Sequence, residues 1–330
     1  LGFTRDKMNA RLSKWDKHLL SFSGRKILIK SVVQSMPQYV MSCYLLPQNI
    51  IDDMTTSIRR YWWSGKADKR GWHMLPWDIV YLPKADEGIG FHDLHHFNIA
   101  LLGKQIWRLI CEPDNLLSQV YKCKYYPSGS VLESDSTRRS SFAWKGLSIA
   151  ISKLGNGFFK RPGMSSQIQI HFDNWGGSKP LHLYGDYEVN EEVPLRAGFF
   201  MLSNLPRWDE SKVRDYFSHE DANTILNVPI INDTKDTTLW GHHDSGIYIV
   251  CSGYQFLQLQ LGPVNRPSRL WKILSKLPTL PKVRSFGWRL SHDALPSGHK
   301  ILQANLGTGV CPICNTDIET TLHALRDCPS

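Results

Sequence analysis

Long apolar runs are missing from this sequence of 330 residues, and no window approaches 18 uncharged apolar residues. A transmembrane helix is therefore not expected, and neither is a membrane partner. Charged residues are also sparse, at 21%, whereas hydrophobic residues reach 42%, which predicts packed cores and excludes a disordered chain. The chain starts LGFTRDKMNARLSKW, without an initiator Met or a signal peptide. We therefore expect an internal piece of a longer protein that is not secreted.

Cysteines are few, seven in all, and too unevenly spaced for a disulfide scaffold. Four of them are scattered along the chain, whereas Cys311, Cys314 and Cys328 are clustered near its end. This distribution predicts a reducing compartment and one metal site.

Catalytic motifs are also missing. Two-metal nucleotidyl transfer requires clustered carboxylates, but Asp52 and Asp53 follow Pro47 at a helix start, where the helix dipole favours acids. Gly88 and Gly90 form a lone glycine pair without a nucleotide-binding context, and no GxSxG elbow occurs. We therefore expect no catalytic residues in this chain, no enzymatic activity and no small-molecule substrate.

The charge that is present is distributed in blocks. Residues 1–30, 121–160 and 261–300 carry net charges of +6, +5 and +7, and residues 171–240 carry −6. Basic blocks are what a polyanionic partner requires, because Lys and Arg side chains that meet phosphates release counterions. The alternative is that each block is a solvated helix face. The 37 aromatic residues (12 Trp, 12 Tyr, 13 Phe) favour nucleic acid modestly, since rings stack on bases.

Apolar periodicity predicts a mainly α fold with minor β structure. Ser23 is the expected N-cap of a helix that stops before Pro37. Strands are expected at 166–172 and, as a pair, at 237–250, with turns and short strands over 66–92. Loops are expected at 155–165 and 174–206. Further helices are expected at 4–21, from Pro47 to Trp63, and at 94–111, 139–154, 209–218, 219–226, 252–260, 268–276, 282–292 and 297–304.

The C-terminus holds the most specific chemical pattern. Cys311-Pro312-Ile313-Cys314 is followed after eight residues by His323, and after four more by Cys328. A helix over 319–325 would carry His323 and end near Cys328. Three sulfurs and one imidazole make a complete tetrahedral set, so the spacing predicts one structural zinc ion with no open position. Unmetallated thiols or a redox CxxC motif are the alternatives, and His292 and His299 are interpreted as surface or capping histidines.

Several blocks that occur in order along most of the chain carry a family resemblance. They are LLSFSGRKILIKSVVQSMPQYVMSCYLLP at 19–47, IRRYWWSG at 58–65, EGIGF at 87–91, FNIALLGKQIWR at 97–108, KYYP at 124–127, GNG at 155–157, DNW at 173–175, LWK at 270–272 and WR at 288–289. Together they resemble the region after the polymerase palm in plant non-LTR (LINE-type) retrotransposon reverse transcriptases, ending in the reverse-transcriptase zinc-binding domain.

The resemblance implies an order of segments. Residues 1–65 would form a thumb-like helical segment, 66–175 a helical connection region with short strands, 176–245 an acidic loop-rich linker region and 246–330 the zinc-binding domain. The family's Asp-Asp polymerase motif and its ribonuclease H domain are missing from the sequence. The resemblance therefore implies that this chain is a C-terminal fragment of an RNA-directed DNA polymerase. The fragment would bind nucleic acid without polymerising it.

A thumb of this type would grip RNA, an RNA–DNA hybrid or target DNA through the phosphate backbone, with weak base specificity. The Ser23–Lys26 turn would place N–H groups and cations near a phosphate. The zinc would be structural, and the family implies a nuclear location. A zinc-stabilised protein-interaction module that binds no nucleic acid is the alternative function. The expected contacts are Arg5, Lys7, Arg11, Lys14, Lys17, Arg25, Lys26, Lys30, Arg284, Arg289 and Lys300.

Overall fold

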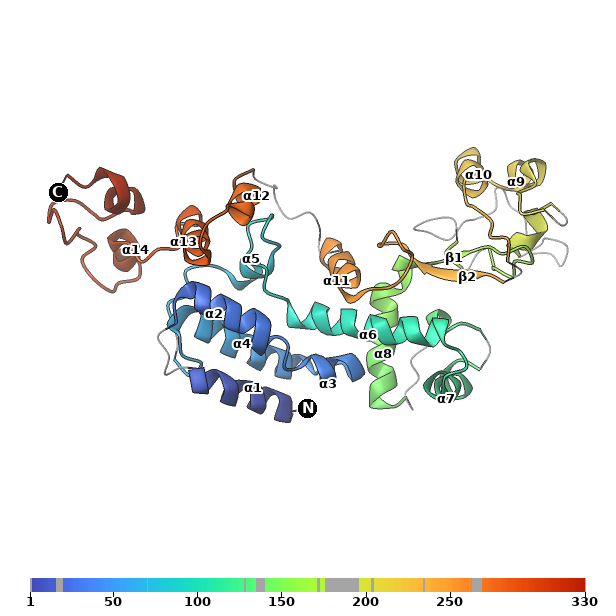
Figure 1. Cartoon of the computed structure of the whole chain (residues 1–330), viewed down its shortest axis with the longest axis horizontal. Helices are drawn as coiled ribbons and strands as arrows, with labels where there is room; N and C mark the ends of the chain where they lie inside the picture. Colours follow the sequence, from blue (N-terminus) through green and yellow to red (C-terminus); the bar gives the residue numbers. More distant parts are fainter. Residues whose placement is uncertain are drawn as a thin grey trace. The chain divides into compact units, whose positions relative to one another are not determined.

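A computed structural model describes most of the chain (Figure 1). The described residues are 2–15, 20–69, 71–127, 129–134, 140–170, 173–175, 196–202, 205–233, 235–260, 262 and 269–329. They are mainly helical, with one two-stranded sheet and a C-terminal Cys/His cluster, which confirms the predicted fold class. None of the helices in these ranges is both long and apolar enough to cross a membrane.

The structure consists of two compact units. Unit 1 contains residues 1–40, 46–95 and 263–330, and unit 2 contains residues 41–45 and 96–262. Thus the two ends of the chain fold into the same unit. These units do not follow the four segments implied by the family resemblance, which remain a prediction.

The described residues of unit 1 form helices and connecting loops. Its core is aromatic: Trp62 is fully buried and meets Phe22 and Phe91 edge to face, with ring centroids 5.1 and 5.3 Å apart. Helix α4 ends at Gly65, whose φ of 78° is the left-handed C-cap that glycine adopts without strain. The helices are α1 (Gly2–Trp15), α2 (Phe22–Leu28), which continues as a π-helical segment (Ile29–Val33), α4 (Gln48–Ser64), α5 (Trp77–Tyr81), α12 (Arg269–Lys276), α13 (Pro281–Ser291) and α14 (Gly298–Gln303).

Unit 2 packs helices against a small antiparallel sheet. Strand β1 (Phe158–Arg161) pairs with β2 (Thr237–Trp240), with Phe158 opposite Trp240. One core lies around α6 and α8, and a second core, around Trp175 and Phe200, involves α9 and α10. The helices are α6 (Leu94–Cys111), α7 (Leu116–Tyr125), α8 (Phe142–Leu154), α9 (Glu210–Tyr216), α10 (His219–Leu226) and α11 (Val250–Leu259); α3 (Gln38–Cys43) contributes its last residues.

Four sequence predictions about local structure were wrong. Ser21, not Ser23, caps α2: its Oγ accepts from the Gly24 N–H at 3.3 Å, while Ser23 is buried against Ser285. The strand expected at 166–172 has only an isolated bridge at Gln169 in its described part. Instead β1 lies in the expected loop 155–165, because β2 pairs with it and not with residues after 246. The region expected to hold short strands, 66–92, forms α5 and no strand among its described residues.

Candidate metal centre and basic side chains

The loop from 309 to 319 carries Cys311 and Cys314 on a tight reversal of the chain. An antiparallel bridge between Val310 and Ile318 closes the loop, and the Cys311 N–H donates to Asp317 O at 2.8 Å. The Asn315 N–H donates back to Cys311 O at 2.9 Å, and Asn315 itself has a left-handed φ of 56°. Asn tolerates this conformation better than most residues, so the sequence supports the turn at the point where the second thiol is needed.

His323 and Cys328 come from a short helical stretch that starts at Thr321 and becomes π-helical over His323–Asp327. The predicted helix at 319–325 is thus present but shifted by two residues. The wide turn is closed by the Cys328 N–H, which donates to His323 O at 2.9 Å. Thr320 Oγ1 accepts from the His323 N–H at 3.0 Å and holds the start of the stretch.

These two segments bring all four predicted ligands together. The donor atoms of Cys311, Cys314, His323 and Cys328 all lie within 4.8 Å of one another. Cys311 Sγ is 4.0 Å from Cys328 Sγ, and Cys314 Sγ is 3.4 Å from His323 Nε2. A tetrahedral zinc with Zn–S bonds of about 2.3 Å places its sulfurs about 3.8 Å apart, whereas a disulfide requires about 2.05 Å. The donor set therefore fits one tetrahedral zinc ion, and the three cysteines and one histidine fill all four ligand positions, which leaves none for a substrate.

The local electrostatics favour a bound cation. Hydrogen bonds from the Thr316 side chain and from the backbone of Asp317 and Thr316 lower the pKa of the Cys314 thiol to about 6. The thiolate, not the thiol, is the metal ligand. Cys311 is fully buried and His323 nearly so, so a thiolate here requires a counter-charge in its immediate surroundings. His292 and His299 are not among the four clustered residues.

Comparisons with known proteins identify this part of the chain. Residues 248–330 match the family described as zinc-binding in reverse transcriptase. An Arabidopsis thaliana protein named "Putative ribonuclease H protein" is 29% identical over the whole chain, which spans about half (54%) of its length. A second Arabidopsis thaliana protein, an uncharacterized mitochondrial protein, is 32% identical over 142 residues, which are 43% of this chain and 92% of that protein.

The chain belongs to the family of reverse-transcriptase-related plant proteins that carry this zinc-binding domain. The predicted resemblance is thereby confirmed. The matched residues of the reverse-transcriptase zinc-binding domain include all four clustered ligands and also α11 to α14.

The basic side chains predicted to touch nucleic acid lie, where described, in unit 1 with the four-ligand cluster of the reverse-transcriptase zinc-binding domain. Lys17 falls outside the described residues. Lys7, Arg11 and Lys14 are exposed along α1, whereas Arg5 on the same helix is paired with Asp53 and Asp6, at 3.0 and 2.9 Å. Among the described residues, Lys7, Arg11 and Lys14 are therefore the basic residues of α1 whose charge is exposed and not in an ion pair.

Arg25 and Arg289 have structural partners. The Arg25 guanidinium donates to the carbonyls of Leu20, Trp62 and Trp63 at 3.1 to 3.3 Å, so it caps the C-terminus of α4. Arg289 lies 4.0 Å from the Phe22 ring centroid and donates to Ala294 O. The expected Ser23–Lys26 phosphate turn is instead the first turn of α2, and its Gly24 N–H is already bonded to Ser21.

The remaining predicted contacts differ in their surroundings. Lys300 pairs with Asp293 at 2.9 Å. Lys26, Lys30 and Arg284 have no ion-pair partner within the described ranges and line a common pocket together with Lys84. Sequence reasoning missed Lys84 because it lies in a turn, where no helical periodicity marks it, although the Pro83-Lys84 pair precedes the glycines at 88 and 90.

Proposed function

We propose that unit 1 binds the sugar–phosphate backbone of RNA, of an RNA–DNA hybrid or of target DNA in a reverse-transcriptase-related protein. Zinc held by the four-ligand cluster would fix the fold of the C-terminal segment and take no part in chemistry. The described residues contribute no catalytic group in this proposal. The nuclear location expected from the family resemblance belongs to the same proposal.

The observation that carries this proposal is the separation of charge between the units. Unit 1 contains 23 Lys and Arg against 13 Asp and Glu, a net charge of +10, whereas unit 2 contains 16 against 17, a net charge of −1. The whole excess of positive charge thus belongs to unit 1, which also holds the four-ligand cluster. A concentrated positive field attracts polyanions at long range and binds phosphates without reading sequence.

Salt-dependent binding tests the proposal. The whole chain would be titrated onto labelled single-stranded RNA and an RNA–DNA hybrid at several salt concentrations. Charge reversal of the exposed α1 residues (Lys7→Glu, Arg11→Glu, Lys14→Glu) is expected to lower affinity about tenfold or more near 0.1 M salt and to flatten the salt dependence. It should do so equally for unrelated sequences, because backbone contacts carry no base information.

The matched control is a triple reversal on unit 2, at the exposed residues Lys122, Lys145 and Lys153. This variant is expected to bind within about threefold of the unchanged chain, because unit 2 has no net positive field. Equal losses in both variants, or no binding to any polyanion at low salt, would refute the proposal.

A protein-interaction module is the second candidate, and one observation favours it. The C-terminal segment exposes several apolar side chains, including Ile313, Leu322 and Leu325, at 62%, 58% and 52% of their surface. Exposed apolar groups gathered on a small segment are typical of protein contact sites. Binding to nucleic acid that is independent of salt and of the α1 charges would favour this candidate.

A further inference from the structure

A cavity of about 350 Å³ in unit 1 gathers four cations. One face of α2 and its π-helical continuation supplies Lys26 and Lys30, the loop after Pro83 supplies Lys84, and α13 supplies Arg284. Lys26 and Lys30 are four residues apart, and so are Arg284 and Trp288, so each pair shares one helix face. Three separate segments of the chain therefore direct positive side chains into one place.

Lys30 and Lys84 both lie against Gly90. A Cβ at Gly90 would lie 3.3 Å from Lys30 Nζ and 3.5 Å from Lys84 Cγ. Gly90 also has a φ of 75°, which favours glycine. Gly90 is thus a common neighbour of Lys30 and Lys84.

No carboxylate lines this cavity among the described residues, and none of its four cations has an ion-pair partner there. The contrast with other cations of unit 1 is direct: Arg5 and Lys300 pair with aspartates, and Arg25 caps a helix. Like charges held close together without a counter-charge destabilise the folded chain. Burial, and then the charges of Lys84, Lys30 and Arg284, lower the pKa of Lys26 to about 8.

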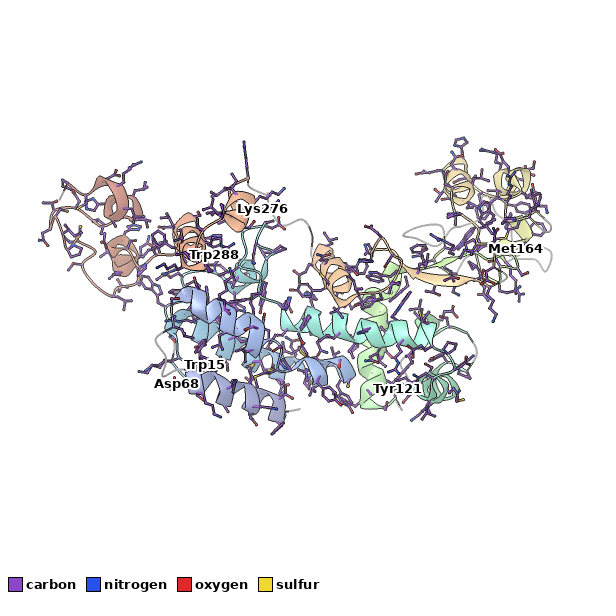
Figure 2. All side chains as sticks on the ribbon, viewed as in Figure 1. Trp15, Asp68, Tyr121, Met164, Lys276 and Trp288 are labelled. Atoms are coloured by element: carbon purple, nitrogen blue, oxygen red, sulfur yellow. The ribbon has the colours of Figure 1, made fainter. Side chains whose placement is uncertain are left out.

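The walls of the cavity are fixed by hydrogen bonds and not by the charges. Ser23 Oγ lies 3.1 Å from Ser285 Oγ in a buried contact that joins α2 to α13. Trp288, labelled on α13 in Figure 2, donates from Nε1 to Glu87 O at 2.6 Å and ties α13 to the loop. The segments that carry the cations are therefore joined before any ligand arrives, which lowers the entropy cost of binding one.

We propose that this cavity, the cation pocket, binds a phosphate group of a nucleic-acid strand through Lys26, Lys30, Lys84 and Arg284. The inference rests on the proposed function and deepens it, because it names the contact point and adds Lys84. The volume equals roughly twelve water molecules, which suits a phosphate group with some of its hydration. A base is less suited, because Trp271 is stacked on His292 at 4.3 Å and Trp288 is buried, so neither ring offers a free face.

Two variants test the cation pocket. Lys26→Met with Lys84→Met removes two charges and keeps the apolar stems. Lys272→Met with Lys282→Met is the control, since both lysines are exposed on α12 and α13 and do not line the cavity. Each chain would be titrated with a labelled single-stranded RNA near 0.1 M salt. The pocket variant is expected to lose about tenfold or more in affinity and to lower the slope of log K against log salt by about 1.5, while the control stays within about threefold.

Inorganic pyrophosphate supplies a readout that needs no nucleic acid. It is expected to raise the Tm of the unchanged chain and of the control, and to leave the Tm of the pocket variant unchanged. Without added anion, the pocket variant is expected to melt at the same or a higher temperature, because repulsion has been removed. A lower Tm would mean that the lysines serve only the fold, and would overturn the proposal.

The RNA and pyrophosphate measurements together distinguish failure of the cation pocket from failure of the proposed function. If the pocket variant binds RNA as tightly as the unchanged chain, the cation pocket is refuted and general backbone binding stands. If no chain binds RNA but pyrophosphate still distinguishes the variants, the proposed function fails and the pocket binds phosphate from another source, which overturns the nucleic-acid assignment. Where the pocket variant loses RNA affinity, RNA strands with a 5′-phosphate and with a 5′-hydroxyl identify the phosphate group that is bound. A preference for the 5′-phosphate indicates a strand end, and equal affinity indicates the internal backbone.

Discussion

The two units differ in the polar and charged clusters that they contain. In unit 2 several buried polar side chains bond the backbone of the same unit: Tyr248 donates to Ala100 O at 2.7 Å, and Asn98 donates to Met41 O and Tyr44 O at 2.7 and 2.9 Å. Unit 1 instead holds two clusters of opposite character: three cysteines with His323, and four cations in a pocket that no carboxylate lines among the described residues.

From this difference we expect unit 1 to depend on ions that the chain does not supply. Thiolates need a cation, and clustered lysines and arginine need an anion. The C-terminal segment shows the first dependence most clearly. Between residues 294 and 329, all of which the structure describes, the buried hydrophobic side chains are Ala294 and Cys311. So small an apolar interior cannot offset the entropy of ordering the segment, and a metal ion has to do so.

Removal of the zinc site should have the largest effect. In the chain as purified we expect one zinc per molecule, and in Cys311→Ser none, because three donors in a partly exposed site hold the ion too weakly. Structural zinc contributes about 10–16 kcal/mol of binding free energy in small zinc modules, and that contribution to folding would be lost. Amide exchange in residues 309–328 should become fast, while the exchange of α6 and α8 stays slow.

Cys251→Ser is the matched control, since Cys251 is an exposed free cysteine on α11. It should retain one zinc and the exchange pattern of the unchanged chain. A chain that contains no metal as purified, or a Cys311→Ser variant with slow exchange over 309–328, would show that the segment does not depend on an ion.

A core substitution in unit 2 tests the other side of the comparison, a unit that is held together by its own apolar core. Trp240 is fully buried, packs 4.8 Å from both Phe158 and Tyr248, and donates to Ser252 Oγ at 2.8 Å. Trp240→Ala should lower the free energy of unfolding by about 3–5 kcal/mol in calorimetry or denaturant titration. Zinc content should stay at one per chain, because unit 2 does not supply the ligands.

Phe142→Ala on α8 is the control for that substitution, because its ring is 52% exposed. Its cost should stay below about 1 kcal/mol. Loss of zinc in Trp240→Ala would contradict the comparison, since it would make the metal segment depend on the unit 2 core.

How well the sequence predicts each region depends on how far apart in the sequence its contacting residues lie. Helix α6 (Leu94–Cys111) was predicted with both ends correct, because eighteen residues carry one apolar face. The four donors that gather at the C-terminus were predicted as a set because they lie within eighteen residues and their spacing alone suggests a cluster. Local periodicity and local spacing are visible in a sequence.

Contacts between distant residues could not be predicted in the same way. Strand β1 pairs with residues 76 to 82 positions further along the chain, so no local pattern near Phe158 predicts a strand. Ile168 and Ile170 alternate as in a strand, but they bury their side chains in the second core of unit 2 without a ladder. The role of Arg25 as a cap of α4 depends on carbonyls nearly forty residues later.

Arg25 and Lys26 are adjacent cations of unit 1, and only the first has partners within the chain. Arg25→Met removes a guanidinium that bonds three carbonyls, and should lower the free energy of unfolding by about 1.5–3 kcal/mol. Lys26→Met should not lower it. Thermal denaturation without added anion measures both. A Lys26→Met variant as destabilised as Arg25→Met would show that both cations serve the fold.

The smallest effect concerns pH, and it tests the charge of Lys26 directly. Its pKa is lowered from 10.5 to about 8, first by burial and then by Lys84, Lys30 and Arg284, which are the charged groups facing it. Between these two values the unfolded chain binds more protons than the folded chain, so stability should rise with pH from about 8 to 10.5. Below pH 8 the lysine is protonated in both states, and its cost to the folded state is constant.

The measurable quantity is the difference in Tm between the unchanged chain and Lys26→Met, because the other titrating groups contribute to both. In buffer free of multivalent anions, Lys26→Met should melt slightly higher at pH 7, and the difference should shrink as pH approaches 10. Pyrophosphate should remove this pH dependence near pH 8, because an anion in the pocket favours protonated Lys26 and raises its pKa. A difference that grows with pH would mean that the charge of Lys26 stabilises the empty pocket, and the contrast between the two units would then rest on the zinc cluster alone.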